Sequence, residues 1–302
     1  MPQETFVGRA IAGYRLIERV GEGGTAEVYR AEHPQHGMCA FKVLRSRLQG
    51  DPTAIKRFLR EAGYGVRVRH PGVVQTYAFG EAEGLYYLAL EWAEGKPLAA
   101  FLHQNAPLAP DLVAPVVQQL ADALSAAHGA GIVHRDLKPE NIMFDERGGT
   151  TKLLDFGIAR DADLPTEERL TRTGFFVGTL QYVAPEALSG ELVDGRADIY
   201  SLATIAYYML TARHPFTGRS PRELFQQLLT QDPTPLRATV TDRRIGPAIE
   251  AVVMRGLARD PAHRQPDVAA FAAEFSAAHS EPPAGGGLLA TIKQMIGRKA
   301  LW

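Results

Sequence analysis

The sequence of 302 residues lacks most features that mark disulfide-rich, membrane-spanning or nucleic-acid-binding chains. Its single cysteine, Cys39, excludes an intramolecular disulfide and fits a reducing compartment. The net charge of −1 gives no basic excess of the kind that nucleic-acid binders carry. No run reaches the ~20 apolar residues of a membrane-spanning helix, and charges interrupt residues 1–20, so no secretory apolar core is expected there. These absences predict a cytoplasmic protein that does not bind nucleic acid.

What is present is the composition of an ordinary globular chain. Hydrophobic residues make up 45% and charged residues 22%, which allows a sizeable buried core. The length suits one large domain or two modest ones. No His/Cys cluster has the spacing of metal ligands.

The stretch 132–157 carries the strongest chemical signal. Two short apolar runs, 142–144 and 152–154, flank a Gly-Gly turn and predict a small hairpin. This hairpin would hold Asp136, Lys138 and Asn141 at a fixed distance from Asp155. An amine, an amide and two acids that converge in this way suit one chemistry: metal ions are held against phosphate oxygens while an acid orients a hydroxyl.

This stretch reads H-R-D-L-K-P-E-N followed by D-F-G, which is the ordered pattern of protein kinases. Over residues 14–279 the chain resembles the eukaryotic-like serine/threonine protein kinases of bacteria. The resemblance implies an α+β, bilobal fold, with a small antiparallel β lobe carrying one helix (14–92) and a larger, mainly α-helical lobe (93–279). Residues 1–13 would form a lead-in, and 280–302 a Pro/Gly linker with a short basic amphipathic tail.

A glycine-rich turn stands between two predicted strands, 14–20 and 26–31. Glycines let the backbone approach phosphates without a Cβ in the way, although an isolated cluster could equally be a flexible turn. The position resembles the kinase glycine-rich loop, with Ala26 where the family has a third glycine. The resemblance implies the following ATP-binding residues: Gly21, Glu22, Gly23, Gly24, Val28, Ala40, Lys42, Glu91, Ala93 and Met143.

The resemblance also assigns catalytic roles. Asp136 would orient the substrate hydroxyl, with Lys138 beside it, and Lys42 paired with Glu61 would position the phosphates. Asn141 and Asp155 would hold Mg²⁺. The activity implied is transfer of the γ-phosphoryl group of ATP to Ser or Thr hydroxyls of a protein substrate.

Residues 158–186 close on A-P-E and resemble an activation segment. Thr171 and Thr173 would be autophosphorylated, and Arg135 would pair with the resulting phosphate. Thr179 would touch Asp136 and Lys138 near the peptide substrate. Three further residues have structural roles in the family: Glu186 and Arg264 pair to brace the segment, and Asp198 anchors the central helix.

The helix that carries Glu61 contains an unusual pair of glycines. Asp51-Pro52 predicts its start, His70-Pro71 its end, and Gly63 and Gly65 lie between. Each costs roughly 1 kcal/mol relative to alanine inside a helix. They would either loosen the helix, so that a second copy of the chain or the tail must order it, or allow close packing of a neighbouring strand.

The other predicted elements are strands at 38–44, 73–79 and 85–91 and helices at 113–127, 198–210, 221–229, 247–258 and 267–278. Two other functions were weighed. A pseudokinase acting as a binding module would lack Lys42, Asp136 or Asp155, and a small-molecule phosphotransferase would usually lack the A-P-E-bounded segment. The tail's apolar stripe fits a helix docked on the kinase or a partner, a helix lying on a membrane surface, or a frayed end.

Overall fold

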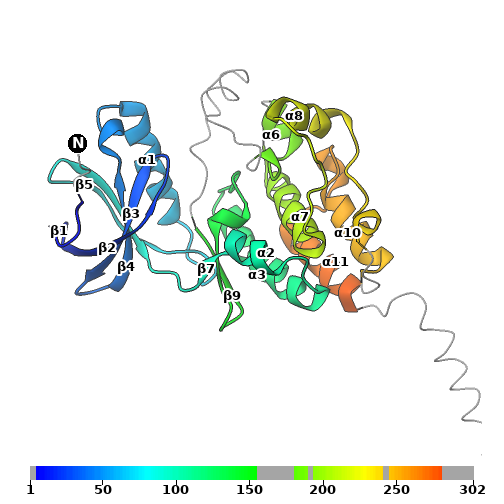
Figure 1. Ribbon diagram of the computed structural model, residues 1–302, viewed down its shortest axis with the longest axis horizontal. Coiled ribbons are helices and arrows are strands. Elements are labelled where there is room, and N and C mark those ends of the chain that lie inside the picture. The colour runs from blue at the N-terminus through cyan, green and yellow to red at the C-terminus, as the bar shows by residue number, and fades with distance from the viewer. Residues whose placement is uncertain (1–4, 155–179, 190–192, 241–244, 281–302) are drawn as a thin grey trace, which may run out of the picture.

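The computed structural model describes residues 5–154, 180–189, 193–240 and 245–280. Figure 1 shows a mainly β lobe and a mainly α lobe side by side, with the short strands β7–β9 on the helical side. The predicted α+β, two-lobed arrangement is confirmed. Among the described residues no helix combines the length and apolar character needed to cross a membrane.

The small lobe is built on a six-stranded sheet in the order β1-β2-β3-β4-β6-β5, whose described pairs are all antiparallel. Period-two alternation on β4 buries Cys39, Phe41 and Val43 and leaves Ala40 and Lys42 on the other face. The sheet thus presents Lys42 away from its own core. The strands are β1 (Ala10–Ile11), β2 (Tyr14–Glu22), β3 (Ala26–His33), β4 (Gly37–Leu44), β5 (Thr76–Ala82) and β6 (Leu85–Glu91).

Helix α1 (Pro52–Gly65) begins as predicted, because the Asp51 carboxylate accepts from the backbone N–H groups of residues 53 and 54. The predicted end at His70-Pro71 is wrong, since the helix stops at Gly65. Helix-weakening glycines occupy its last turn, and the Arg67 side chain beyond it donates to Ala130 O at 2.7 Å. The chain therefore leaves the helix axis early to reach the other lobe.

The start of the next strand was also mispredicted. Strand β5 begins at Thr76 rather than at Val73. Val73 and Val74 are apolar and buried, but they pair with Leu153 of β9 instead of with β6. Apolar alternation cannot distinguish these two partners, so the boundary could not be read from the sequence.

The two glycines of α1 have different surroundings. Gly65 is buried against β5, and a Cβ placed there would come within 3.0 Å of Thr76 Oγ1. A Cβ on Gly63 would meet nothing within 4 Å. Gly65 therefore fits the close-packing interpretation, and only Gly63 fits the loosened-helix interpretation.

We expect alanine to have opposite effects at these positions. Gly63→Ala should raise the free energy of unfolding by about 1 kcal/mol, because alanine has the higher helix propensity and meets open space. Gly65→Ala should lower it by about 1–3 kcal/mol through overpacking against Thr76. Urea unfolding of both variants beside wild type measures the difference. Equal changes of the same sign would contradict this division.

The predicted hairpin is present as β8 (Ile142–Asp145) and β9 (Thr150–Leu153), which pair in antiparallel register, and β7 (Lys96–Pro97) adds a third strand. Leu154 N–H donates to Asn141 O at 2.9 Å, so the residue before Asp155 is bonded to Asn141. The hairpin thus joins Asn141 to the end of β9, and Asp155 itself lies outside the described residues.

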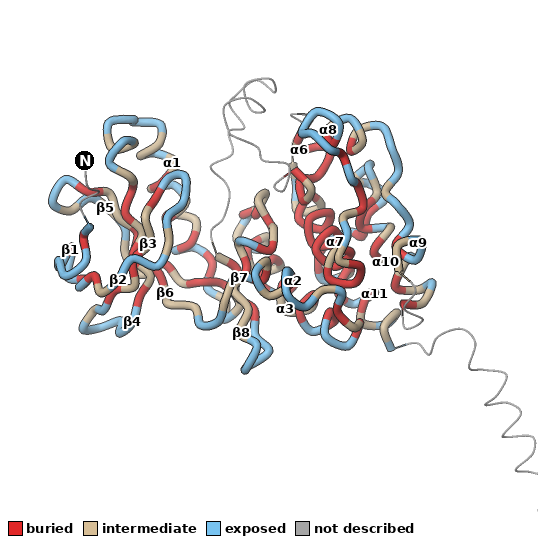
Figure 2. Tube along the Cα trace, in the orientation of Figure 1, coloured by how far each residue is buried: buried red, intermediate tan, exposed pale blue. Residues whose placement is uncertain are grey.

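The large lobe packs around α7 (Arg196–Thr211), which Figure 2 shows buried along nearly its whole length. Helices α3 (Pro110–Gly129), α8 (Pro221–Thr230), α10 (Pro247–Gly256) and α11 (Val268–Ser280) match the predicted ones within a few residues. Three of the described α-helices were not predicted: α2 (Leu98–Asn105), α9 (Leu236–Thr239) and α6 (Pro185–Ser189), which contains the end of the A-P-E motif.

Candidate active site

The catalytic loop is held by one buried carboxylate on α7. Asp198 has no exposed surface and accepts from the backbone N–H groups of His134 (2.8 Å) and Arg135 (2.9 Å). His128 Nε2 lies 2.7 Å from the same carboxylate. A buried carboxylate needs such donors to offset its lost hydration. Asp198 therefore fixes the loop backbone directly before Asp136.

Arg135 adopts a left-handed backbone conformation, with φ of 62°. Residues other than glycine rarely do so, and the strain persists only where neighbours enforce it. The bond from Arg135 N–H to Asp198 is one such restraint. Its side-chain Nε is buried and has no hydrogen-bond partner among the described residues.

Asp136, Lys138 and Asn141 form one hydrogen-bonded group, as the motif predicted. Lys138 Nζ lies 3.0 Å from Asp136 Oδ2, and both side chains are largely buried. Asn141 Nδ2 donates to Asp136 O at 2.8 Å and to Asp136 Oδ2 at 3.1 Å. These contacts fix the orientation of the carboxylate while its lysine neighbour supplies positive charge.

Lys42 and Glu61 meet across the small lobe. Lys42 Nζ on β4 lies 3.4 Å from Glu61 Oε1 on α1, and both side chains are mostly buried. Strand register places Val28 opposite Lys42, and Ala40 follows on the same face. The predicted phosphate-positioning and adenine-facing residues of the small lobe therefore share one side of the sheet.

Two arginine side chains that were not predicted as site residues donate hydrogen bonds to the glycine-rich turn. Gly23 N–H closes the turn onto Ala26 O at 2.8 Å. Arg45 and Arg47 donate to the carbonyls of Gly23 (3.1 Å) and Gly24 (2.7 Å). Both follow β4 directly, and no local pattern predicts that they fold back over the turn.

A second unpredicted contact joins the end of β6 to β9. The Lys152 ammonium pairs with the Glu91 carboxylate, which also accepts from Gln75 N–H at 3.1 Å. Glu91 was predicted as an ATP-binding residue, and its side chain is engaged in this pair. Ala40 and Ala93 both pack against one buried apolar cluster of the small lobe. Met143 on β8 pairs in register with Lys152 on β9.

Glu186 and Arg264 form a buried, bidentate ion pair. Arg264 Nη1 and Nη2 reach the two Glu186 oxygens at 2.7 and 2.8 Å, and the Arg264 side chain has no exposed surface. Arg264 also donates to three backbone carbonyls of the large lobe. The end of the A-P-E motif is thereby fixed to the lobe's interior.

The described end of the activation segment packs on a neutral histidine. Burial lowers the pKa of His214 to about 4, and its ring contacts Tyr182 edge-on and stacks on Tyr208. Tyr182 O accepts from Ser201 Oγ on α7 at 2.7 Å. These ring contacts and the hydrogen bond hold residues 180–184 in place, and the neutral histidine adds no charge beside them.

The predicted residues Asp155, Thr171, Thr173 and Thr179 lie outside the described residues. Within the described part of the chain, no group of three or more His, Cys, Asp or Glu side chains could hold a metal. Asn141 nevertheless fits a hard cation, because its bonds to Asp136 use Nδ2. Its carbonyl Oδ1 is an oxygen donor of the kind that Mg²⁺ takes.

The fold and this constellation define a two-lobed phosphotransferase-type architecture, and the comparisons agree. The family model for the protein kinase domain matches residues 14–273. The chain is 39% identical over 285 residues to the serine/threonine-protein kinase Pkn3 of Myxococcus xanthus, covering 92% of this chain and 52% of Pkn3. It is 38% identical over 271 residues to PknB of Mycolicibacterium smegmatis, covering 88% and 43%.

Solved structures lead to the same family. The kinase domain of Mycobacterium tuberculosis PknI superposes with a TM-score of 0.69 at 30% identity, over 90% of this chain and 98% of that one. Rad53 in complex with AMP-PNP gives a TM-score of 0.69 at 27% identity, over 86% and 64%. This chain belongs to the protein kinase family. It spans about half the length of the curated relatives it matches.

Proposed function

We propose that this chain is a serine/threonine protein kinase that transfers the γ-phosphoryl group of ATP to a protein hydroxyl. The observation that supports this most is the hydrogen-bonded group of Asp136, Lys138 and Asn141, anchored through Asp198. The relatives named serine/threonine-protein kinase support the substrate class. The binding-module alternative has no observation in its favour, because Lys42, Glu61 and Asp136 are all engaged in the expected way.

The roles follow from the chemistry of each group. Asp136 would accept or orient the substrate hydroxyl proton, and Lys138 would lie beside the oxygen that gains charge. Lys42, set by Glu61, would contact the nucleotide phosphates, and the glycine-rich turn would cover them. Mg²⁺, held by Asn141 and Asp155, would neutralise charge on the phosphate oxygens. Val28, Ala40 and Met143 would contact the adenine, with the backbone of 91–93 bonding to its edge.

Transfer of label from γ-labelled ATP to a generic protein tests this directly. The purified chain should label Ser and Thr but not Tyr, with Mg²⁺ present and not with Ca²⁺ or EDTA. α-Labelled ATP should give no protein label, because the bond that breaks lies between the β and γ phosphates. Labelling of tyrosine alone, or no labelling of the protein with any divalent metal, would contradict the proposal.

We also propose that phosphate on Thr171 and Thr173 switches the enzyme on through Arg135. The support is the buried Arg135 Nε, which lacks a partner among the described residues. Thr171→Ala with Thr173→Ala should lower kcat at least about tenfold, the effect of losing one charge-assisted hydrogen bond of 1.5–3 kcal/mol. Thr166→Ala, a neighbour in the same segment, is the matched control. Steady-state rates after autophosphorylation are the readout, and unchanged rates in the double variant would remove the switch.

The match of the protein kinase family model to residues 14–273 supports a single catalytic domain. We propose a catalytic domain at 14–279, divided at 92/93, with 1–13 as lead-in and 280–302 as linker and tail. Gly63 leaves α1 open to an ordering contact, from a second copy of the chain or from the tail. Contact of the tail with a partner or a membrane surface stays a prediction from its apolar stripe.

A further inference from the structure

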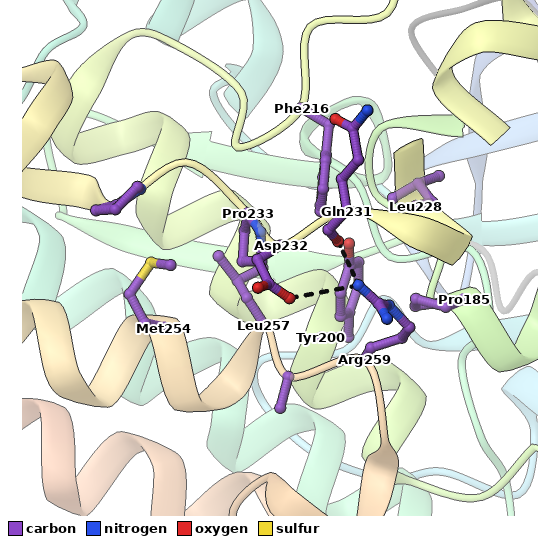
Figure 3. Close-up of a pocket in the computed structure, with 12 residues that line it drawn as sticks. Pro185, Tyr200, Phe216, Leu228, Gln231, Asp232, Pro233, Met254, Leu257 and Arg259 are labelled. Carbon is purple, nitrogen blue, oxygen red and sulfur yellow. Dashed lines mark hydrogen bonds and ion pairs between the residues drawn. The ribbon is translucent and has the colours of Figure 1, made fainter. Parts of the chain in front are cut away.

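The large lobe contains a hollow that takes no part in the proposed chemistry. Its volume is about 360 Å³, within the range of small-ligand sites. Figure 3 shows it between α7, α8 and α10, closed on one side by the loop that carries Gln231, Asp232 and Pro233. We call it the α7–α10 pocket. None of its lining residues is a predicted ATP-binding or catalytic residue.

Most of the lining is apolar. The side chains of Phe216 and Leu228 form one wall, and those of Met254 and Leu257 form the other. Pro185, the residue before Glu186, also contributes. Such walls favour a ligand with an aromatic or branched hydrocarbon body over a fully polar one.

A buried hydroxyl lies among these walls. Tyr200 is 1% exposed, and its hydroxyl has no hydrogen-bond partner among the described residues. An unsatisfied buried hydroxyl costs about 1–3 kcal/mol, so native structures rarely leave one without a reason. Figure 3 shows the Tyr200 side chain among the residues that line the pocket. Burial raises the pKa of this phenol, so it stays protonated and able to donate.

The second polar group at the pocket is the Arg259 guanidinium, which keeps N–H donors available for a ligand. Arg259 reaches Gln231 O at 2.7 Å and Asp232 Oδ1 at 3.3 Å, and both contacts use Nη2. Its Nε and Nη1 make no hydrogen bond to the described residues. The Asp232 side chain is 99% exposed, so its pair with Arg259 is screened by water and contributes little. Positive charge at the pocket is therefore poorly neutralised.

We propose that the α7–α10 pocket is a second ligand site, for a small carboxylate with an aromatic or branched apolar body. The Arg259 fork would take the carboxylate oxygens side-on, and the Tyr200 hydroxyl would donate to one of them. The hydrocarbon body would fill the space between Phe216, Leu228 and Met254. Tyr200 and Arg259 both offer hydrogen-bond donors, which favours an acceptor over an amine, and the Asp232 carboxylate that also lines the pocket is turned toward Arg259 Nη2.

Occupancy would reach the anchor of the activation segment. The Arg264 guanidinium lies 5.1 Å above the Tyr200 ring, and Arg264 Nη2 donates to Arg259 O at 3.1 Å. The arginine that holds Glu186 thus contacts both residues, Tyr200 through its ring and Arg259 through its backbone carbonyl. A ligand that fixes Tyr200 and Arg259 should therefore stabilise this ion pair, which gives the site a means of regulating the segment.

Calorimetric titration of the full chain with sodium hydrocinnamate tests the site, and hydrocinnamamide is the uncharged control of the same shape. Wild type should bind the carboxylate about tenfold or more tightly than the amide, the difference made by one good charged contact. Arg259→Gln should abolish that preference, and Tyr200→Phe should weaken carboxylate binding while keeping the ring beneath Arg264. Arg255→Gln, in the last turn of α10 just before Arg259 but paired with Glu274, should change nothing.

Leu228→Trp should block both probes by filling the pocket. Saturating ATP should leave the affinity of the carboxylate unchanged, which separates this site from the proposed nucleotide site. Binding does not depend on phosphoryl transfer, so failure here leaves the proposed function untouched. Equal affinity for the two probes, an unaffected Arg259→Gln variant, competition by ATP, or no binding up to ~10 mM would each overturn the proposal.

Discussion

Asp136→Asn should lower kcat for phosphoryl transfer by about a thousandfold, within the range that a positioned acid or base contributes. The substitution keeps the shape of the side chain and removes its charge and basicity. Asn141 bonds to the backbone carbonyl of residue 136 as well as to its side chain, so the loop should keep its geometry. ATP binding should change by less than about twofold, because the residues proposed to face the nucleotide lie elsewhere.

Steady-state kinetics and an ATP-binding titration on the same preparation separate the two effects. The matched control is Asp122→Asn, which removes an exposed carboxylate of α3 bonded to Gln118 and should leave both quantities unchanged. Near-normal turnover in the Asp136→Asn variant would show that another group orients the hydroxyl. Loss of ATP binding together with turnover would indicate that the residue holds the nucleotide site together.

The second large effect concerns stability. Arg264→Ala should lower the free energy of unfolding by about 3–5 kcal/mol, because it leaves the Glu186 carboxylate buried without its partner. Arg264 also satisfies three backbone carbonyls, which would lose their donors. For a chain of this size the melting temperature should fall by about 10 °C.

The controls for this prediction use other ion pairs of the large lobe. Arg255→Ala removes a partner of Glu274 in a pair whose side chains are 46% and 36% exposed, and should cost no more than about 1 kcal/mol. Replacing both buried partners, Arg264→Met with Glu186→Leu, should be less damaging than Arg264→Ala alone, because no uncompensated charge remains. Equal losses for Arg264→Ala and Arg255→Ala would contradict the importance given to burial.

The sequence predicted the parts of the site that lie close together along the chain. The catalytic loop and the hairpin span residues 132–154, and the glycine-rich turn sits between adjacent strands, so their geometry follows from local rules. The pairs Lys42–Glu61 and Glu186–Arg264 join distant elements. They could be predicted only because the chain resembles a family in which those contacts occur.

Contacts between residues that belong to no recognisable sequence motif could not be predicted. Nothing in the local sequence indicates that Arg45 and Arg47 reach back to the glycine-rich turn, or that Lys152 pairs with Glu91. The same holds for the early end of α1 at Gly65 and for the contact that Arg67, just beyond it, makes with Ala130 of the other lobe. Gly63 and Gly65 show the limit clearly: identical residues, two apart, differ because one faces Thr76 and the other faces open space.

The central claim is that this chain catalyses γ-phosphoryl transfer to Ser or Thr through Asp136. Intact-protein mass spectrometry of the Asp136→Asn variant as the substrate tests it most directly. Incubated with Mg-ATP alone, the variant should keep its mass. With a catalytic amount of wild type added, the variant, or a generic protein supplied beside it, should gain phosphate on Ser and Thr. Phosphate gained without wild type, or none gained with it, would contradict the account.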